Sequence, residues 1–102
     1  MIRIMLVCSS GMSTSLLVSK MKKAAEKSNI EVDINAIGSA QLSSHTDNLD
    51  VVLLGPQVRF MLNNIREQLE PKGVPVDVIN NLDYGTMNGE KVLKFALSLA
   101  EK

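Results

Sequence analysis

The sequence predicts an α/β fold built on a single open four-stranded parallel sheet, and three observations support this. Strand-like and helix-like segments alternate along the whole chain, a pattern typical of parallel sheets with right-handed crossovers. Two of the strand-like segments are almost continuously apolar, as strands buried on both faces are. The length of 102 residues fits one domain, which we expect to span residues 1–102.

The four predicted strands differ in pattern, and the difference predicts their order in the sheet. Ile2–Val7 and Val51–Leu54 are the apolar segments, so they should be the central strands. Val32–Ile37 alternates between apolar and polar residues, and Val74–Ile79 contains a proline, which a central strand tolerates poorly. These two should be edges. The expected strand order is 2-1-3-4, with helices on both faces, as in the low-molecular-weight phosphatases.

Helical periodicity marks the segments between the strands. Thr14–Ser28 places Leu17, Met21, Ala24, Ala25 and Ser28 on one face and Lys20, Lys23 and Lys27 on the opposite face. We interpret the lysines as a solvated face, with partner docking as the alternative. The spacing also predicts helices over Val58–Leu69 and Val92–Ala100, and a short helix or irregular crossover over Gly38–Asn48.

Cys8 follows the first predicted strand at a place where a ligand site is expected. With the order 2-1-3-4, the sheet reverses direction between strands 1 and 3. Ligands of open α/β sheets bind beyond the carboxyl ends of the strands at such a switch point. Cys8 and Gly55, which follow these two strands, should therefore lie beside this site.

The loop after Cys8 consists mainly of small residues and leads into the first helix. Gly11 and the small side chains allow successive backbone N–H groups to converge on an anion, and the helix N-terminus favours negative charge there. Ser13, Thr14 or Ser15 can cap that helix. The same environment favours the nucleophilic thiolate. We therefore expect attack by sulfur on phosphorus, with backbone amides holding the phosphoryl oxygens.

Composition excludes several other classes of function. The 11 basic residues balance 11 acidic ones, which argues against nucleic-acid binding. One cysteine and one histidine cannot build a thiolate–imidazole zinc site, and we expect no metal and no cofactor. No segment has the pattern of a membrane span or signal peptide, so we expect a complete cytoplasmic protein with a reduced thiol. We also expect a monomer, because no apolar stripe is left over.

Two alternatives to phosphoryl transfer follow from the same residues. A cysteine-dependent phosphatase of the low-molecular-weight type has a similar loop but places an arginine six residues after its cysteine. Thr14 occupies that position here, and the loop holds no Arg or Lys to stabilise a hydrolytic transition state. The other alternative is a flavodoxin-like module that binds a free anion. A loop that captures phosphate without hastening its hydrolysis favours a carrier over both.

Two motifs resemble a known family. Cys8–Ser19 (CSSGMSTSLLVS) and Asp50–Gln57 (DVVLLGPQ) are similar to the enzyme IIB component of the bacterial phosphoenolpyruvate-dependent sugar phosphotransferase system. The closest branch is the one for lactose, cellobiose and diacetylchitobiose. The resemblance covers the whole chain and implies that Cys8 carries the phosphoryl group as phosphocysteine. It further implies a phosphate-binding loop of Ser9, Ser10, Gly11, Met12, Ser13, Thr14 and Ser15.

The resemblance also implies the partners. Cys8 would receive its phosphoryl group from a phosphohistidine of enzyme IIA, which the carrier protein HPr charges. It would pass the group to a sugar held by the membrane enzyme IIC, and the sugar would enter the cell as its 6-phosphate. Pro56, Gln57 and Tyr84 are candidates for the rim of the site or for partner contacts. His45 is interpreted as a solvated loop residue, and exposure of Met12 would indicate a docking surface.

Overall fold

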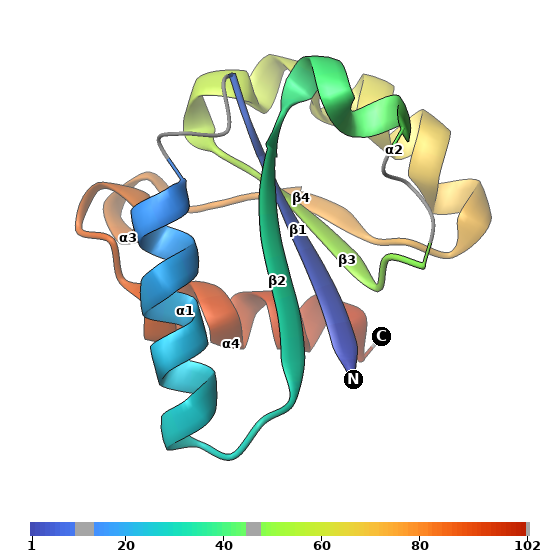
Figure 1. Ribbon diagram of the computed structural model, residues 1–102. Helices are drawn as coiled ribbons and strands as arrows, with labels where there is room; N and C mark the ends of the chain where they lie inside the picture. Colours follow the sequence, from blue (N-terminus) through green and yellow to red (C-terminus); the bar gives the residue numbers. More distant parts are fainter. Residues whose placement is uncertain (10–13, 45–47, 102) are drawn as a thin grey trace.

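A four-stranded parallel sheet in the order β2-β1-β3-β4 forms the centre of the computed structural model (Figure 1). The structure describes residues 1–9, 14–44 and 48–101. The strand order and the parallel pairing are those predicted from the apolar patterns. The strands are β1 (Ile2–Cys8), β2 (Val32–Gly38), β3 (Val51–Leu54) and β4 (Val76–Val78).

Helices connect the strands and cover both faces of the sheet. The α-helices are α1 (Ser15–Lys27), α2 (Leu62–Leu69), α3 (Asn81–Gly85) and α4 (Gly89–Ala100). Shorter 3-10 helices lie at η1 (Ser39–Ser44), η2 (Pro56–Met61) and η3 (Glu70–Lys72). In Figure 1, α1 and α4 lie on one side of the strands, and η1, η2 and α2 lie on the other.

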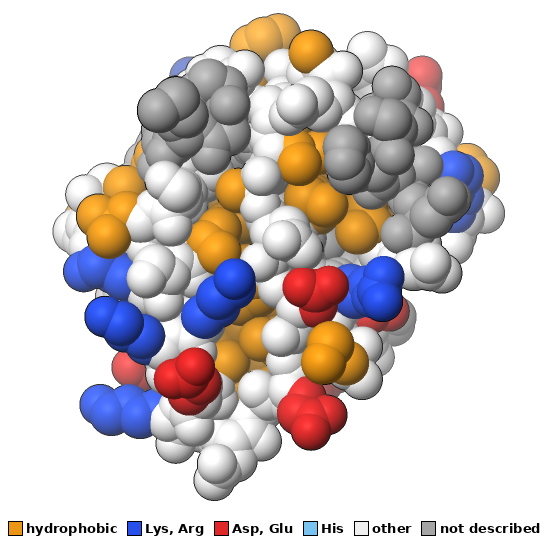
Figure 2. All heavy atoms as spheres, in the orientation of Figure 1, with side chains coloured by type: hydrophobic (Ala, Val, Ile, Leu, Met, Phe, Trp, Pro, Cys, Tyr) orange, Lys and Arg blue, Asp and Glu red, His pale blue; other side chains and the backbone are white. Residues whose placement is uncertain are grey.

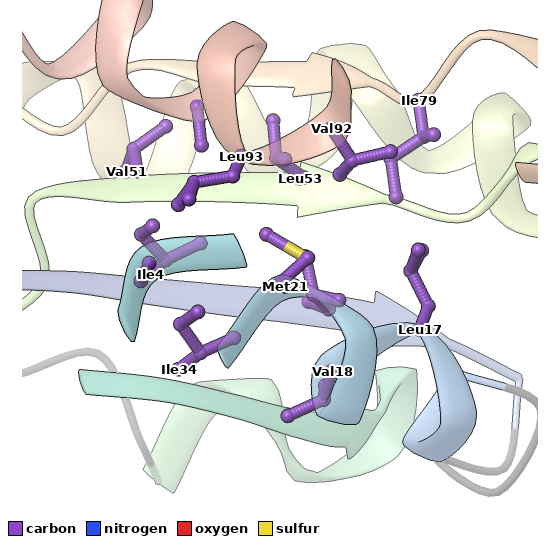
Figure 3. Close-up of a cluster of buried hydrophobic side chains, with 13 residues drawn as sticks. Ile4, Leu17, Val18, Met21, Ile34, Val51, Leu53, Ile79, Val92 and Leu93 are labelled. Atoms are coloured by element: carbon purple, nitrogen blue, oxygen red, sulfur yellow. The ribbon is translucent and has the colours of Figure 1, made fainter. Parts of the chain in front are cut away.

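Two separate hydrophobic clusters hold these layers to the sheet. Figure 3 shows the first cluster, in which side chains of the central strands point toward those of α1 and α4. The second cluster, on the opposite face, joins β1, β3 and β4 to η1, η2 and α2. Alternate residues of β1 supply the two clusters, Ile4 and Leu6 the first and Met5 and Val7 the second, because successive side chains of a strand point to opposite faces.

The edge strand β4 is shorter than the predicted segment Val74–Ile79. Its regular part covers Val76–Val78 only, because proline at position 75 lacks the backbone N–H that a strand residue donates. The flanks nevertheless bond to β3: the Val52 amide donates to the Pro75 carbonyl at 3.0 Å, and the Ile79 amide to the Leu54 carbonyl at 2.8 Å. At the other edge, β2 runs one residue beyond the prediction, to Gly38.

The helices also differ from the predictions in detail. The predicted helix Val58–Leu69 is divided between the end of η2 and α2, which meet at Met61 and Leu62. Within η2, the backbone of Val58 leaves helical geometry with φ −114° and ψ 21°. The placement of Ser28 on the buried face of the first helix was wrong, because it is exposed and is the C-cap of α1. Helix α3 was not predicted. The crossover after β2 forms η1, as the short-helix alternative anticipated.

Candidate functional site

Cys8 is the last residue of β1 and lies between the two halves of the sheet. It pairs with Gly38 of β2, and its side chain is fully buried. On the other side, the Gly55 amide donates to the Val7 carbonyl at 2.7 Å. A Cβ atom placed on Gly55 would lie 3.6 Å from the Cβ of Cys8. The cysteine thus occupies the predicted switch point, beside the residue that follows β3.

Thr14 contacts the sulfur directly. Its hydroxyl donates a hydrogen bond to the Sγ of Cys8 over 3.6 Å, and both side chains are fully buried. Thr14 is the only polar or charged residue classed as buried in the described part of the chain. A buried hydroxyl normally has a hydrogen-bond partner, and here one partner is the cysteine sulfur.

This contact corrects the expected role of the Thr14 side chain. Thr14 is the N-cap of α1, and its carbonyl accepts from the Val18 amide at 2.9 Å. Its side chain makes no capping hydrogen bond. The geometry therefore brings the hydroxyl to the sulfur, at the position where the phosphatases carry their arginine. A hydroxyl is a neutral donor, and it stabilises a charged sulfur less than a guanidinium would.

Gln57 and Tyr84 meet at the rim of the site. The Nε2 of Gln57 donates to the Tyr84 hydroxyl over 2.9 Å. The Oε1 of Gln57 lies over Gly55, only 2.6 Å from where a Cβ on that residue would stand. Absence of a side chain at Gly55 therefore leaves room for the Gln57 carboxamide. Pro56 occupies the first position of η2, as its sequence context suggested.

Helix α3 positions Tyr84, and sequence reasoning missed this helix. The Asn80 side chain caps it by accepting from the amides of Leu82 and Asp83, at 2.8 Å and 3.3 Å. The signal was present in the sequence: an asparagine followed three residues later by an acidic residue is typical of a helix N-terminus. The helix has only five residues, too few to show a period.

The remaining site candidates are distributed as follows. Ser9 is an exposed bend residue after β1, and Ser15 is the exposed first residue of α1. Other predicted members of the phosphate loop lie outside the described residues, as does His45, so the convergence of loop amides on an anion stays a prediction. The undescribed loop members are Ser10, Gly11, Met12 and Ser13.

The described residues also bear on metal binding, membrane crossing and the satisfaction of buried polar atoms. No group of three or more His, Cys, Asp or Glu side chains in this part of the chain is arranged to hold a metal ion. None of its helices combines the length and the apolar character that crossing a bilayer requires. All its buried side-chain nitrogen and oxygen atoms have hydrogen-bond partners.

Known proteins resemble the chain over nearly its whole length. It is 46% identical over 101 residues to the galactose-specific EIIB component of a phosphotransferase system (PTS) in Lactococcus lactis subsp. cremoris, covering 94% of each chain. It is 40% identical over 97 residues to an oligo-beta-mannoside-specific EIIB component of Bacillus subtilis, covering 95% of this chain and 94% of the other.

Solved structures resemble it as well. The solution structure of a cellobiose-specific phosphotransferase IIB component from Borrelia burgdorferi matches with a TM-score of 0.81 and 49% identity, over 98% of this chain and 92% of the other. A YwlE mutant from Bacillus subtilis matches with a TM-score of 0.54 and 14% identity, over 98% and 94%. The second likeness concerns the fold alone.

The family model for the lactose/cellobiose-specific IIB subunit of the PTS matches residues 3–95. This match includes the strand that ends in Cys8, the rim residues Gln57 and Tyr84, and most of α4. Together with the relatives above, it shows that the chain belongs to the lactose/cellobiose-specific IIB subunit family of the sugar phosphotransferase system.

Proposed function

We propose that this IIB subunit is a phosphoryl carrier in which the sulfur of Cys8 holds the phosphoryl group between two transfers. The observation that carries the proposal is the place of Cys8: a buried thiol at the switch point of the sheet, with the hydroxyl of Thr14 at its sulfur. Membership of a phosphotransferase family supports phosphoryl chemistry over binding alone. The chain would act in the cytoplasm as a monomer.

In the first transfer, the thiolate of Cys8 attacks the phosphorus of a phosphohistidine on enzyme IIA. The S–P bond forms as the P–N bond breaks, and the leaving imidazole nitrogen takes up a proton in place of the phosphoryl group. The thiol proton of Cys8 goes to solvent before the attack, since the thiolate is the nucleophile. The product is a phosphocysteine, which carries close to two negative charges at neutral pH.

In the second transfer, the 6-hydroxyl of a sugar held by enzyme IIC attacks the phosphocysteine. The O–P bond forms, the S–P bond breaks, and the thiolate of Cys8 is regenerated. The hydroxyl proton goes to a base on enzyme IIC. No metal or cofactor takes part, so the task of this chain is positioning and electrostatic stabilisation, as in other phosphoryl transfers.

Three described residues support the reacting sulfur in this proposal. The Thr14 hydroxyl donates to it before transfer, and the carboxamide of Gln57 lies over Gly55, the residue that follows β3. Tyr84 accepts from the Nε2 of Gln57 and so orients that carboxamide. The phosphoryl oxygens would be held by amides and hydroxyls of Ser9–Ser15, with no Arg or Lys in that segment.

The sugar belongs to the lactose, cellobiose and diacetylchitobiose class in this proposal. Relatives with 46% and 40% identity are named for galactose and for oligo-beta-mannosides. Such closely related IIB chains with different sugars are expected if enzyme IIC, and not this subunit, holds the sugar. Specificity would then be a property of the IIC partner.

One experiment tests the carrier proposal. The protein is incubated with phosphoenolpyruvate, enzyme I, HPr and a cognate IIA protein, and its intact mass is measured. We expect a gain of one phosphoryl group that Cys8→Ser abolishes. Addition of membranes with IIC and sugar should remove the group from the wild type and yield the sugar 6-phosphate.

The alternatives predict other results in the same assay. A cysteine phosphatase would turn over para-nitrophenyl phosphate continuously and accumulate no phosphoprotein. An anion-binding module would bind inorganic phosphate without any covalent gain in mass, and Cys8→Ser would leave that binding intact. Absence of a mass gain with several IIA proteins would count decisively against the carrier.

A further inference from the structure

One side of α1 carries an unbroken basic stripe that begins at the site. Leu16, Lys20, Lys23 and Lys27 follow the spacing i, i+4, i+7 and i+11, which places them on one face of a helix. All four are exposed, Leu16 to 56%. Leu16 is the second residue of the helix and lies two residues after the N-cap Thr14, which contacts the sulfur. The stripe thus runs from an apolar residue at the site to three lysines farther away.

These lysines have no acidic partner within the described residues. The three ion pairs found there join Arg3 to Asp33, Arg66 to Asp77 and Lys94 to Glu90. Like charges three and four residues apart on a helix repel one another and destabilise it slightly. Such an arrangement is unexpected in a chain whose formal net charge is zero.

Another exposed flank of α1 shows a different distribution of charge. Lys22 lies beside Glu26, four residues on, and both line a depression that also includes Glu31 and Asp33. Figure 2 shows several basic side chains along the edge of the molecule where α1 lies, with acidic side chains also visible beside them. The two exposed faces of the same helix therefore differ in their charge.

The basic stripe borders a surface groove. Lys20, Lys23 and Lys27 line one wall, and the segment from Met87 to Glu90 lines the other, around a volume of about 460 Å³. Glu90, the one acidic residue of that wall, is paired with Lys94 at 3.4 Å. The groove therefore presents three uncompensated positive charges to whatever lies in it.

A protein docked over Cys8 would reach this groove. An α-helix rises by about 1.5 Å per residue, which places Lys20 about 7 Å and Lys27 about 18 Å along the axis from Ser15. A standard interface buries roughly 800 Å² on each partner, a disc of about 16 Å radius. A footprint centred on the sulfur would therefore cover Lys20 and Lys23 and end near Lys27.

We propose that the Leu16–Lys27 stripe and its groove form the docking surface for the protein that donates the phosphoryl group, and that this donor presents acidic side chains to it. The inference rests on the proposed carrier function. Charge complementarity selects this occupant, because the donor approaches as a phosphoprotein and the stripe beyond Leu16 consists of three exposed lysines. Leu16 provides the apolar contact close to sulfur, and the lysines steer the encounter from farther away.

The test compares neighbouring lysines on different sides of α1. Lys23→Glu changes the stripe, whereas Lys22→Glu makes the same exchange one residue away on the side that contains Glu26. The second-order rate of Cys8 phosphorylation by phosphorylated cognate IIA is measured between low and high salt. Alkylation of Cys8 by iodoacetamide, a small reagent that needs no docking, reports that the site is intact in every variant.

The stripe variants and the control variant should differ clearly in their rates of Cys8 phosphorylation. We expect Lys23→Glu to lower the rate at low salt severalfold and the triple variant K20E/K23E/K27E to lower it by about tenfold or more, with a flattened salt dependence. Lys22→Glu should stay within about twofold of the wild type, and alkylation should be unchanged throughout. A wild type that IIA never phosphorylates would instead refute the carrier function itself.

Two other results would overturn the docking surface while leaving the carrier function in place. In the first, the triple variant is phosphorylated as fast as Lys22→Glu. In the second, its phosphorylation is normal but it loses binding to phosphatidylglycerol vesicles that retain the wild type, which would assign the stripe to the membrane surface.

Discussion

The sulfur of Cys8 and the hydroxyl of Thr14 form the contact on which the candidate site depends. Both side chains are fully buried, and a hydrogen bond in the protein interior is electrostatically stronger than one in water. A neutral donor favours the thiolate over the thiol without supplying a full positive charge. In the proposed carrier function, that balance would suit a sulfur that first accepts a phosphoryl group and then releases it.

Replacement of Thr14 tests this contact. Thr14→Val removes the hydroxyl and keeps the shape, so we expect the rate of Cys8 alkylation by iodoacetamide at neutral pH to fall by about tenfold, as for the loss of a hydrogen bond to a charged group. Phosphorylation by IIA should fall in parallel. Thr14→Ser keeps the hydroxyl and should stay within about threefold of the wild type. Equal rates for the Val and Ser variants would show that the hydroxyl does not act on sulfur.

Gly55 offers a second prediction at this scale. A methyl group there would meet the Oε1 of Gln57 at 2.6 Å but would lie 3.5 Å from the Val7 carbonyl, so the carboxamide must move while the backbone need not. We expect Gly55→Ala to change the free energy of unfolding in urea by less than about 1 kcal/mol. Transfer from IIA to Cys8 should nevertheless slow severalfold. Gln57→Ala should reproduce the slower transfer, and a fast Gly55→Ala variant would exclude a role for the carboxamide.

Residue identities were easier to predict than side-chain directions. Cys8 was found because a strand end, a loop of small residues and a helix start coincide in the sequence. Thr14 was one of three candidates, with Ser13 and Ser15, for the cap of α1. It is the N-cap residue, but its side chain bonds to sulfur. No local pattern distinguishes these two orientations, because both leave the backbone of an N-cap unchanged. The contact of Gln57 with Tyr84 spans 27 positions and depends on the whole fold.

At the scale of elements, helix α1 is held in place mainly by its packing against α4. The closest approach is at Gly89, the first residue of α4. A Cβ atom there would lie 2.5 Å from the carbonyl carbon of Lys20 and 2.7 Å from the Met21 amide nitrogen. Backbone atoms cannot yield as a flexible side chain does. Glycine at this position therefore sets the distance between the two helices, and through α1 the position of Thr14.

Gly89→Ala should destabilise the protein more than a similar change nearby. We expect a loss of about 2 kcal/mol in the free energy of unfolding, within the range for overpacked sites, together with slower phosphorylation because α1 shifts. Gly85→Ala is the matched control, since a Cβ there meets nothing within 4 Å, and it should be neutral or slightly stabilising. Urea denaturation followed by circular dichroism measures both. Similar losses for the two variants would contradict the packing argument.

The elements that the sequence predicted well are those with a strong pattern. The wholly apolar segment VVLL became β3 with every residue buried. Helical periodicity placed Leu17, Met21, Ala25, Val92 and Ala96 on the buried faces, but it missed the buried Val18 and Leu93. The failures have local causes. Proline shortened β4, and α3 was too short for periodicity to show it. The first turn of the predicted second helix belongs to the 3-10 helix η2 and not to an α-helix. The strand order was predictable because strands that are buried on both faces consist almost entirely of apolar residues.

At the scale of the molecule, the edge strand β4 is shielded against pairing with another chain. The Nε of Arg66 donates to the Val76 carbonyl at 3.0 Å, and the Val78 amide donates to Asp77 at 2.8 Å. Arg66 and Asp77 also form an ion pair. Side chains thus form hydrogen bonds with backbone groups on the outer edge of β4, with which a second strand would otherwise pair. This supports the expectation of a monomer, although Leu16, Phe60 and Leu82 are exposed.

Arg66→Ala tests this shielding. It frees the Val76 carbonyl and removes the ion pair to Asp77, so we expect the sedimentation coefficient to rise with protein concentration. The wild type should sediment as a monomer throughout. Arg59→Ala removes an exposed arginine that makes no ion pair within the described residues, and it should behave as the wild type does. A monomeric Arg66→Ala variant would show that other features protect the edge.

The hydrogen bond between Gln57 and Tyr84 has a consequence for how the two faces of the sheet open and close. Gln57 belongs to η2, which is anchored in one hydrophobic cluster, and Tyr84 packs against the other. The bond therefore connects elements that pack on opposite faces of the sheet. Local unfolding of either layer would break the hydrogen bond between Gln57 and Tyr84. A phosphoryl group bound there should then slow amide hydrogen exchange in α1 and η2 together, and make two otherwise independent opening motions a single cooperative one.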